Sequence, residues 1–182
     1  MIEVRFHGRG GMGVKMSAHL LGLTAFFSGK QTQDFALYGA ERRGAPVTSF
    51  TRYDKKTVRE RGYIQYPNAI VILDETLNFD IMIHGLKKDG FIIINSTKDP
   101  QYFKRKFKIK NPVYCIDATN IALKHLKKPI ANTAVLGSLI KFLGLPLKNL
   151  EKAIDSALKE RGHPEMIKQN IETIKETYKV IK

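Results

Sequence analysis

The sequence contains one cysteine, Cys115, no tryptophan and no long apolar run. A single cysteine excludes a disulfide within the chain, and it cannot supply the roughly four thiolates that an iron–sulfur cluster takes. The apolar runs are shorter than the roughly 20 residues of a membrane helix, and the first residues lack a signal-peptide pattern. We therefore expect a cytoplasmic protein without membrane contact, in which Cys115 is a buried strand residue.

The common catalytic patterns are also missing. The histidines are scattered, without HxxxH or HExxH spacing, and no G-x-S-x-G nucleophile elbow or Walker lysine loop is present. The sequence therefore predicts a binding component that has neither catalytic residues nor metal ligands of its own.

Acidic residues are few, since 17 Asp and Glu stand against 31 Lys and Arg, and the net charge is +14. This balance favours polyanions, phosphorylated ligands or an acidic protein partner. The basic residues are spread along the chain, and the basic segment 98–110, which we expect to be a connection, has no nucleic-acid recognition motif. A solvated or partner-facing surface is therefore preferred to nucleic-acid binding.

The length of 182 residues and the 43% of hydrophobic residues predict one globular domain over 1–182. Alternating and helical spacing of apolar residues predicts a strand over 2–7, a helix over 12–28 and a strand over 46–53. The segment 32–44 has little periodicity and is expected to be a loop.

Two unbroken apolar runs, 69–73 and 91–94, are typical of parallel strands that are buried on both faces. A short crossover helix is expected over 77–86 between them, and a further strand over 113–116. Helices are expected over 119–126, 132–143, 147–160 and 164–178, with Asn132 as an N-cap and Gly144 as a stop. The predicted class is α/β, a Rossmann-like layered fold with a mostly parallel central sheet and a helical C-terminal third.

Gly8, Gly10 and Gly13 form a G-x-G-x-x-G pattern between the first strand and the first helix. In this context, backbone amides and the helix dipole can hold a phosphate. A nicotinamide site would also need an acidic residue about 20 residues further on, at the end of a second strand. Asp34 has that spacing, but no strand is expected around it. The alternative is that the glycines only let the helix approach the sheet.

A second polar cluster contains Arg42 and Arg43, which are framed by Gly39 and Gly44 and preceded by Glu41. Two adjacent guanidinium groups can clamp an anion, or they can lock a subunit interface if Glu41 pairs with them. Both interpretations stay open on these residues alone.

Three blocks of the chain resemble the gamma subunits of 2-oxoacid:ferredoxin oxidoreductases. They are Gly8–Gly13, Tyr38–Val47 followed by Phe50–Arg52, and Asn132–Gly137. The E-R-R-G-A-P-V form of the second block, followed by Arg59–Arg61, resembles the pyruvate branch, whereas relatives for other oxoacids more often have R-G-G there.

The resemblance implies a complex that oxidatively decarboxylates pyruvate with coenzyme A to acetyl-CoA and CO2 and reduces ferredoxin. Thiamine diphosphate, magnesium and iron–sulfur clusters would be held by the alpha, beta and delta subunits, and none by this chain alone. The chain itself would help to assemble the complex and bind coenzyme A, with Met12 and Val14 against the adenine. The candidate contacts are Gly8, Gly10, Gly11, Met12, Gly13, Val14, Arg42 and Arg43.

Two alternatives follow from the same residues. The chain could be the gamma subunit of a 2-oxoisovalerate or other 2-oxoacid enzyme, or be shared with one, because it need not contact the substrate side chain. A free-standing NAD-binding module would use the same glycine loop in a protein of another class.

Overall fold

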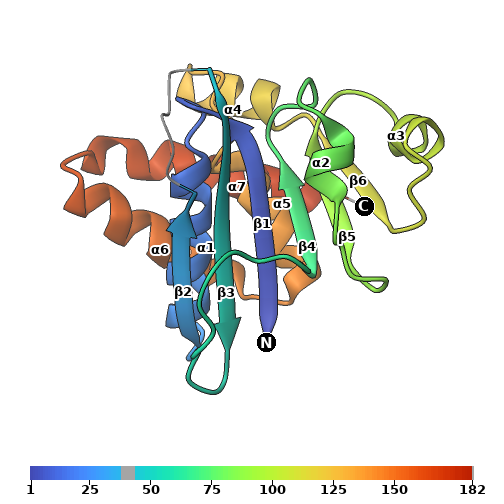
Figure 1. Ribbon diagram of the computed structural model, residues 1–182. Coiled ribbons are helices and arrows are strands. Elements are labelled where there is room, and N and C mark those ends of the chain that lie inside the picture. Colours follow the sequence, from blue (N-terminus) through green and yellow to red (C-terminus); the bar gives the residue numbers. More distant parts are fainter. Residues whose placement is uncertain (38–43, 182) are drawn as a thin grey trace.

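A six-stranded sheet forms the centre of the computed structural model, which describes residues 1–37 and 44–181 (Figure 1). The strands lie in the order β2-β3-β1-β4-β5-β6. Their bounds are β1 (Ile2–Arg9), β2 (Gln31–Ala36), β3 (Pro46–Asp54), β4 (Ala69–Ile72), β5 (Phe91–Asn95) and β6 (Val113–Ile116). The helices are α1 (Val14–Phe27), α2 (Phe79–Ile83), α3 (Pro100–Lys106), α4 (Ala118–Leu126), α5 (Ala134–Leu143), α6 (Leu147–Glu160), the 3₁₀ turn η1 (Pro164–Met166) and α7 (Ile167–Val180). The predicted α/β class and helical C-terminal third are confirmed.

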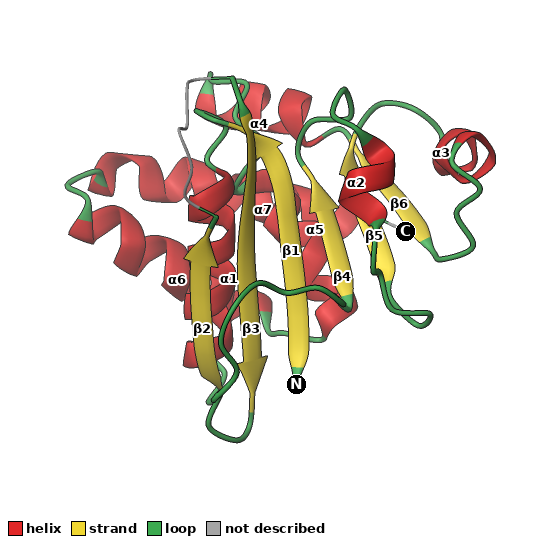
Figure 2. Cartoon of the chain, in the orientation of Figure 1, coloured by secondary structure: helices red, strands yellow, loops and turns green. Residues whose placement is uncertain are grey.

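Strands β1, β4, β5 and β6 are parallel, and β3 runs antiparallel to both of its neighbours, β1 and β2. The sheet is therefore mixed, with the parallel part that the apolar runs predicted. From β1 the chain continues into α1 on one face of the sheet, and from β4 it continues into α2 on the other face (Figure 2). Open α/β sheets bind ligands at such a switch point, beyond the carboxyl ends of the strands.

The larger core lies between one face of the sheet and helices α1, α4, α5, α6 and α7 (Figure 1). Helix α5 is central to it, because all residues from 134 to 140 are buried. Gly137 lets α7 approach closely, since a Cβ at this position would lie 2.2 Å from the backbone oxygen of Ile174. A helix that is apolar on all sides is typical of such a central position.

A smaller core lies on the opposite face, where α2 and α3 cover β4, β5 and β6. The ring of Phe79 on α2 stacks on those of Phe103 and Phe107, with centroid distances of 5.2 and 4.3 Å. Strands β4 and β5 are thus buried on both faces, which explains their unbroken apolar sequences. In the described part of the chain, no helix covers this face of β1, β2 and β3 (Figure 2).

Two elements correct the expectations from the sequence. Residues 31–36 form the strand β2 and are not a loop, and residues 100–106 form the helix α3 within the basic segment 98–110. Strand β2 lies at the edge of the sheet and most of its side chains are half-buried, so its sequence carries no strict alternation. Helix α3 is short. Asp99 as N-cap and Pro100 as first residue are signals of a helix start, but they stand in a segment in which basic residues dominate.

The expected cap of α5 is displaced by one residue. Thr133 is the N-cap and makes no side-chain cap bond, whereas the side chain of Asn132 accepts a hydrogen bond from the Thr133 amide at 2.7 Å. The predicted stop is confirmed, because Gly144 has a φ of 66° and ends the helix in the left-handed conformation. Among the described residues, no helix has the length and apolar character that a membrane span requires.

Candidate functional site

The glycine loop lies between the carboxyl end of β1 and the start of α1, at the switch point of the sheet. Gly11 and Gly13 have φ values of 93° and 75°, which side chains other than glycine rarely adopt. Gly13 is the N-cap of α1 and makes no side-chain cap bond, so the first turn of the helix offers backbone N–H groups. This geometry suits a phosphate or another anion.

Close packing also requires two of these glycines. A Cβ on Gly8 would lie 2.7 Å from the Val14 side chain, and one on Gly13 would lie 2.3 Å from the amide nitrogen of Asn132. Val14 is buried in the larger core, which gives its side chain a packing role. Met12 folds back over its own loop, since its sulfur accepts a hydrogen bond from the Arg9 amide.

The first and third blocks of the resemblance meet at this loop. The hydroxyl of Ser17 on α1 donates to the backbone oxygen of Asn132 at 3.0 Å, and the Asn132 side chain packs against Gly13. The segment before α5 therefore fixes the beginning of α1.

The flank of the second block also reaches the loop. The Gly44 amide donates to the backbone oxygen of Gly10, and the Gly10 amide donates to that of Ala45. Arg42 and Arg43 lie outside the described residues. Because Gly44 and Ala45 pair with the glycine loop, the chain positions next to Arg43 lie at the same edge of the sheet.

An ion pair between Arg9 and Asp74 spans the switch point and holds the glycine loop in place. The guanidinium of Arg9 donates to Asp74 at 2.5 Å and to the Thr76 hydroxyl at 2.8 Å, just beyond the end of β4, and to the backbone oxygen of Gly44. Burial alone would raise the pKa of Asp74, but hydrogen bonds from Thr76 and Arg9 outweigh it and lower this pKa. Arg9 thus fixes the shape of the loop.

A second polar network continues along the same edge. Glu75 accepts hydrogen bonds from Ser96 at 2.5 Å and Lys98 at 2.7 Å, and the Asn95 amide donates to Thr119. These residues were not among the site residues predicted from the sequence. Their signal was that Asn95 and Ser96 stand at the end of an apolar strand and Glu75 shortly after another, where parallel strands place their carboxyl ends together.

Asp34 does not lie at this edge. It stands in the middle of β2 and faces α1, where it lies 3.2 Å from the His19 ring and next to Gly22. The expectation of no strand around Asp34 was wrong, and the strand places its carboxylate away from a ribose site. Asp34 is part of the packing of β2 on α1.

The other titratable residues have structural surroundings. His7 is buried beside Arg5, and burial together with the positive charge of Arg5 lowers the pKa of His7 to about 3. Cys115 lies half-buried in β6, where burial raises the pKa of its thiol to about 12. Within residues 1–37 and 44–181, no group of three or more His, Cys, Asp or Glu side chains could hold a metal ion.

An apolar cavity of about 130 Å³ opens beside the glycine loop, between α1, α6 and the start of α7. Met16, Asn132 and Met166 are among the residues that line it. The site thus combines an anion-binding helix terminus, a fixed glycine loop and a nearby apolar hollow.

Comparison with known proteins supplies the family. Residues 3–180 match the model of the pyruvate ferredoxin/flavodoxin oxidoreductase family. The chain is 42% identical to the pyruvate/ketoisovalerate oxidoreductases common subunit gamma of Pyrococcus furiosus, over 98% of this chain and 96% of that one. It is 35% identical to the pyruvate synthase subunit PorC of Thermotoga maritima, over 99% and 94%. The crystal structure of the pyruvate oxidoreductase subunit PORC from Thermotoga maritima superposes with a TM-score of 0.87, at 34% identity and over 100% and 97% of the two chains.

Proposed function

Since the chain belongs to the pyruvate ferredoxin/flavodoxin oxidoreductase family, we propose that it is the gamma subunit of a pyruvate:ferredoxin oxidoreductase. The observation that carries this proposal is similarity over the whole chain to relatives that are named as such subunits. The complex converts pyruvate and coenzyme A to acetyl-CoA and CO2 and passes two electrons to ferredoxin, and the reaction is reversible. The chain is one gamma domain over 1–182.

Sister subunits, alpha, beta and delta, hold the thiamine diphosphate, magnesium and iron–sulfur clusters in this proposal. The chain itself contains one cysteine, too few for a cluster that takes about four thiolates. Its own part is to assemble with them and to contact coenzyme A, and the complex works in the cytoplasm.

The coenzyme A contact is proposed at the glycine loop. Coenzyme A carries phosphates, and the uncapped first turn of α1 presents backbone N–H groups at the switch point of the sheet. Gly10, Gly11 and Gly13 would let a phosphate approach the backbone, with Met12 nearby and Arg42 and Arg43 as the adjacent cations. Gly8 and Val14 would support this loop by packing together.

Gly13→Ala tests the loop in the complex assembled with its sister subunits. The new Cβ would displace Asn132 and strain the backbone, so the KM for coenzyme A should rise about tenfold, a change of about 1.4 kcal/mol. Gly29→Ala is the matched control, because Gly29 has a similar φ of 73° with open space around it. Equal KM values in both variants would contradict the loop as the contact.

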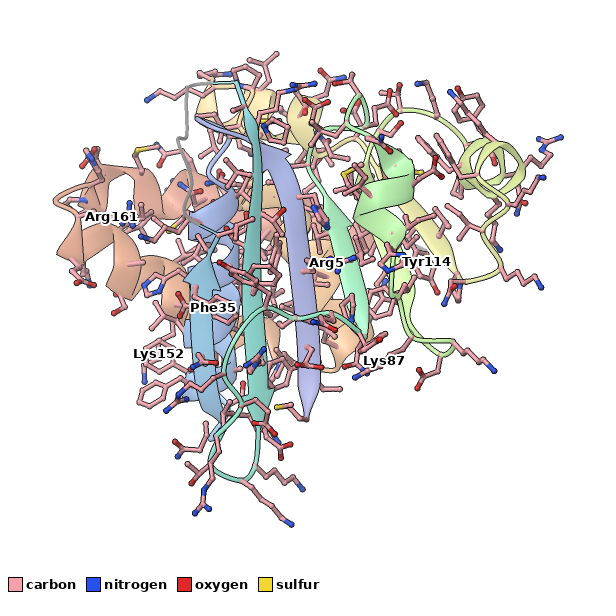
Figure 3. The ribbon with its side chains drawn as sticks, viewed as in Figure 1. Arg5, Phe35, Lys87, Tyr114, Lys152 and Arg161 are labelled. Carbon is pink, nitrogen blue, oxygen red and sulfur yellow. The ribbon has the colours of Figure 1, made fainter. Side chains whose placement is uncertain are left out.

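The double variant Arg42→Gln and Arg43→Gln separates the two interpretations of the second block. A higher KM for coenzyme A with an unchanged yield of complex supports an anion clamp, and a lower yield supports a subunit interface. Arg161→Gln is the control, because this exposed arginine lies at the far end of α6 (Figure 3). No change in either quantity would contradict both roles.

Purification of the chain with its natural partners tests the function as a whole. We expect larger iron-containing subunits and coenzyme A-dependent reduction of ferredoxin by pyruvate. Activity with 2-oxoisovalerate as well would indicate a shared gamma subunit, which the name of the Pyrococcus furiosus relative motivates. Recovery of the chain alone, with tight NAD binding, would contradict the proposal.

A further inference from the structure

The face of the sheet opposite α1 has an open hollow over strands β1 and β3. Only the segment 55–68, which joins β3 to β4, crosses this face in the described part of the chain (Figure 1). The hollow has a volume of about 370 Å³, and its walls include Leu37, Phe50, Tyr63 and Ile81. We call this surface the aromatic hollow.

Exposed apolar side chains gather at the aromatic hollow. Among the described residues, nine large hydrophobic side chains are exposed, and four of them line this one cavity. They are Leu37, Tyr63, Tyr66 and Ile81, with 41%, 58%, 63% and 70% of their surface accessible. Tyr63 also stacks on Phe50, which in turn stacks on Phe35, so that the rings form a continuous shelf. A contiguous apolar patch of this kind marks an interaction site.

The polar floor of the hollow is already satisfied by the chain itself. The guanidinium of Arg5 donates to the His7 ring at 3.0 Å and to the backbone oxygens of Ile64, Met82 and His84 at 3.3, 2.8 and 2.6 Å (Figure 3). These bonds fasten the crossing segment and the end of α2 to β1. Arg5 therefore does not require an anionic small ligand, and the apolar rim is what remains to be covered.

A basic segment borders the aromatic hollow. Residues 55–61 expose four basic side chains, Lys55, Lys56, Arg59 and Arg61, against the single acidic Glu60. Within residues 1–37 and 44–181, none of the four makes an ion pair. Aromatic residues and arginine are enriched in the centres of protein interfaces.

We propose that the aromatic hollow docks an acidic segment of a sister subunit, which inserts an apolar side chain between Tyr63, Tyr66 and Ile81. This inference rests on the proposed function, because it takes the sister subunit as the partner. Carboxylates of that segment would meet the basic side chains of residues 55–61. A second copy of this chain fits poorly, since a symmetric contact would bring two basic segments together and both copies carry a charge of +14.

The test uses the complex assembled from all its subunits. The double variant Tyr66→Ser and Ile81→Ser removes the apolar rim, and we expect binding of the chain to its sister subunits to weaken about 100-fold. The matched control is Leu123→Ser with Val180→Ser, which removes two exposed apolar side chains from α4 and α7, on the other side of the sheet. The control should bind like the wild type.

A charge variant provides a second measurement. Arg59→Glu with Arg61→Glu should weaken binding about tenfold and reduce its dependence on salt, because exposed rim charges act mainly by long-range attraction. Both side chains are exposed, so this variant decides the matter if the serine variant fails to fold.

The outcomes separate the two proposals. Wild-type affinity in both variants overturns the docking role. The docking role is also overturned if the isolated chain forms dimers, or is retained on nucleic acid, and only the serine variant abolishes this behaviour. Failure of the wild-type chain to assemble with any sister subunit refutes the proposed function instead.

Discussion

The two faces of the sheet at β1 and β3 are built from different chemistry. On the face that α1 covers, apolar side chains such as Val4 and Phe6 are completely buried, and the hydroxyl of Thr51 donates a hydrogen bond to the backbone oxygen of Ala18. On the other face, the guanidinium groups of Arg5 and Arg52 are buried and hydrogen-bonded to carbonyl groups of the crossing segment. The first face is stabilised by the close packing of apolar side chains. The second depends on hydrogen bonds and leaves an apolar rim uncovered.

A cavity on the first face should have the largest effect on stability. Leu139→Ala removes a fully buried side chain from α5, and we expect the free energy of unfolding to fall by about 3 kcal/mol. Urea denaturation measures the change. Leu123→Ala, at an exposed position of α4, should change it by less than about 0.5 kcal/mol. Similar losses in the two variants would contradict the burial of Leu139 in the larger core.

Loss of the buried arginine should have a smaller and more local effect. Arg5→Met leaves the backbone oxygens of Met82 and His84 without their donor, and we expect a loss of about 2 kcal/mol. Because a further bond of Arg5, to the backbone oxygen of Ile64, fastens the crossing segment, amide exchange should accelerate most at residues 62–66. Arg161→Met is the control at an exposed site. Unchanged exchange at 62–66 would show that Arg5 does not hold the segment.

His7 should make the second face sensitive to acid. Its pKa is lowered from about 6.5 to about 3 in the folded chain, so the unfolded chain binds the proton first as the pH falls. Stability is therefore complete above pH 6.5 and declines between pH 6.5 and 3. From pH 8 to 5.5 the contribution of His7 is a loss of about 1.4 kcal/mol. Denaturation at both pH values, with His7→Gln as the comparison, isolates it, and an equal loss in both proteins would contradict it.

The same contrast explains what the sequence could predict of the fold. Strands β4 and β5 are buried on both faces, α5 is buried over residues 134–140, and α6 and α7 each bury one side, so their apolar patterns were visible in the sequence. Strand β2 was missed because its position depends on pairing with β3 at the edge of the sheet, and its half-buried side chains leave no periodic pattern. Helix α3 was missed because lysines dominate its short sequence.

The candidate site was predictable only in part. The glycine loop was identified from the G-x-G-x-x-G spacing of Gly8, Gly10 and Gly13 between a strand and a helix, and the structure gives Gly13 a positive φ that favours glycine. The residues that hold the loop in place were not identified, because Arg9 and Asp74 are 65 residues apart and no local pattern in the sequence joins them. The resemblance included the segment that begins with Asn132, and the structure explains that position by its contact with Gly13.

The smallest effect on stability is expected at the rim of the aromatic hollow. Tyr66→Ser with Ile81→Ser should change the free energy of unfolding of the chain alone by no more than about 0.5 kcal/mol per site, because both side chains are mostly exposed. Thermal and urea unfolding measure this change, with Leu123→Ser as the exposed control. A loss close to that of Leu139→Ala would mean that the rim belongs to the core of this chain. A small loss together with weakened binding to the sister subunits would place the contribution of the rim in assembly.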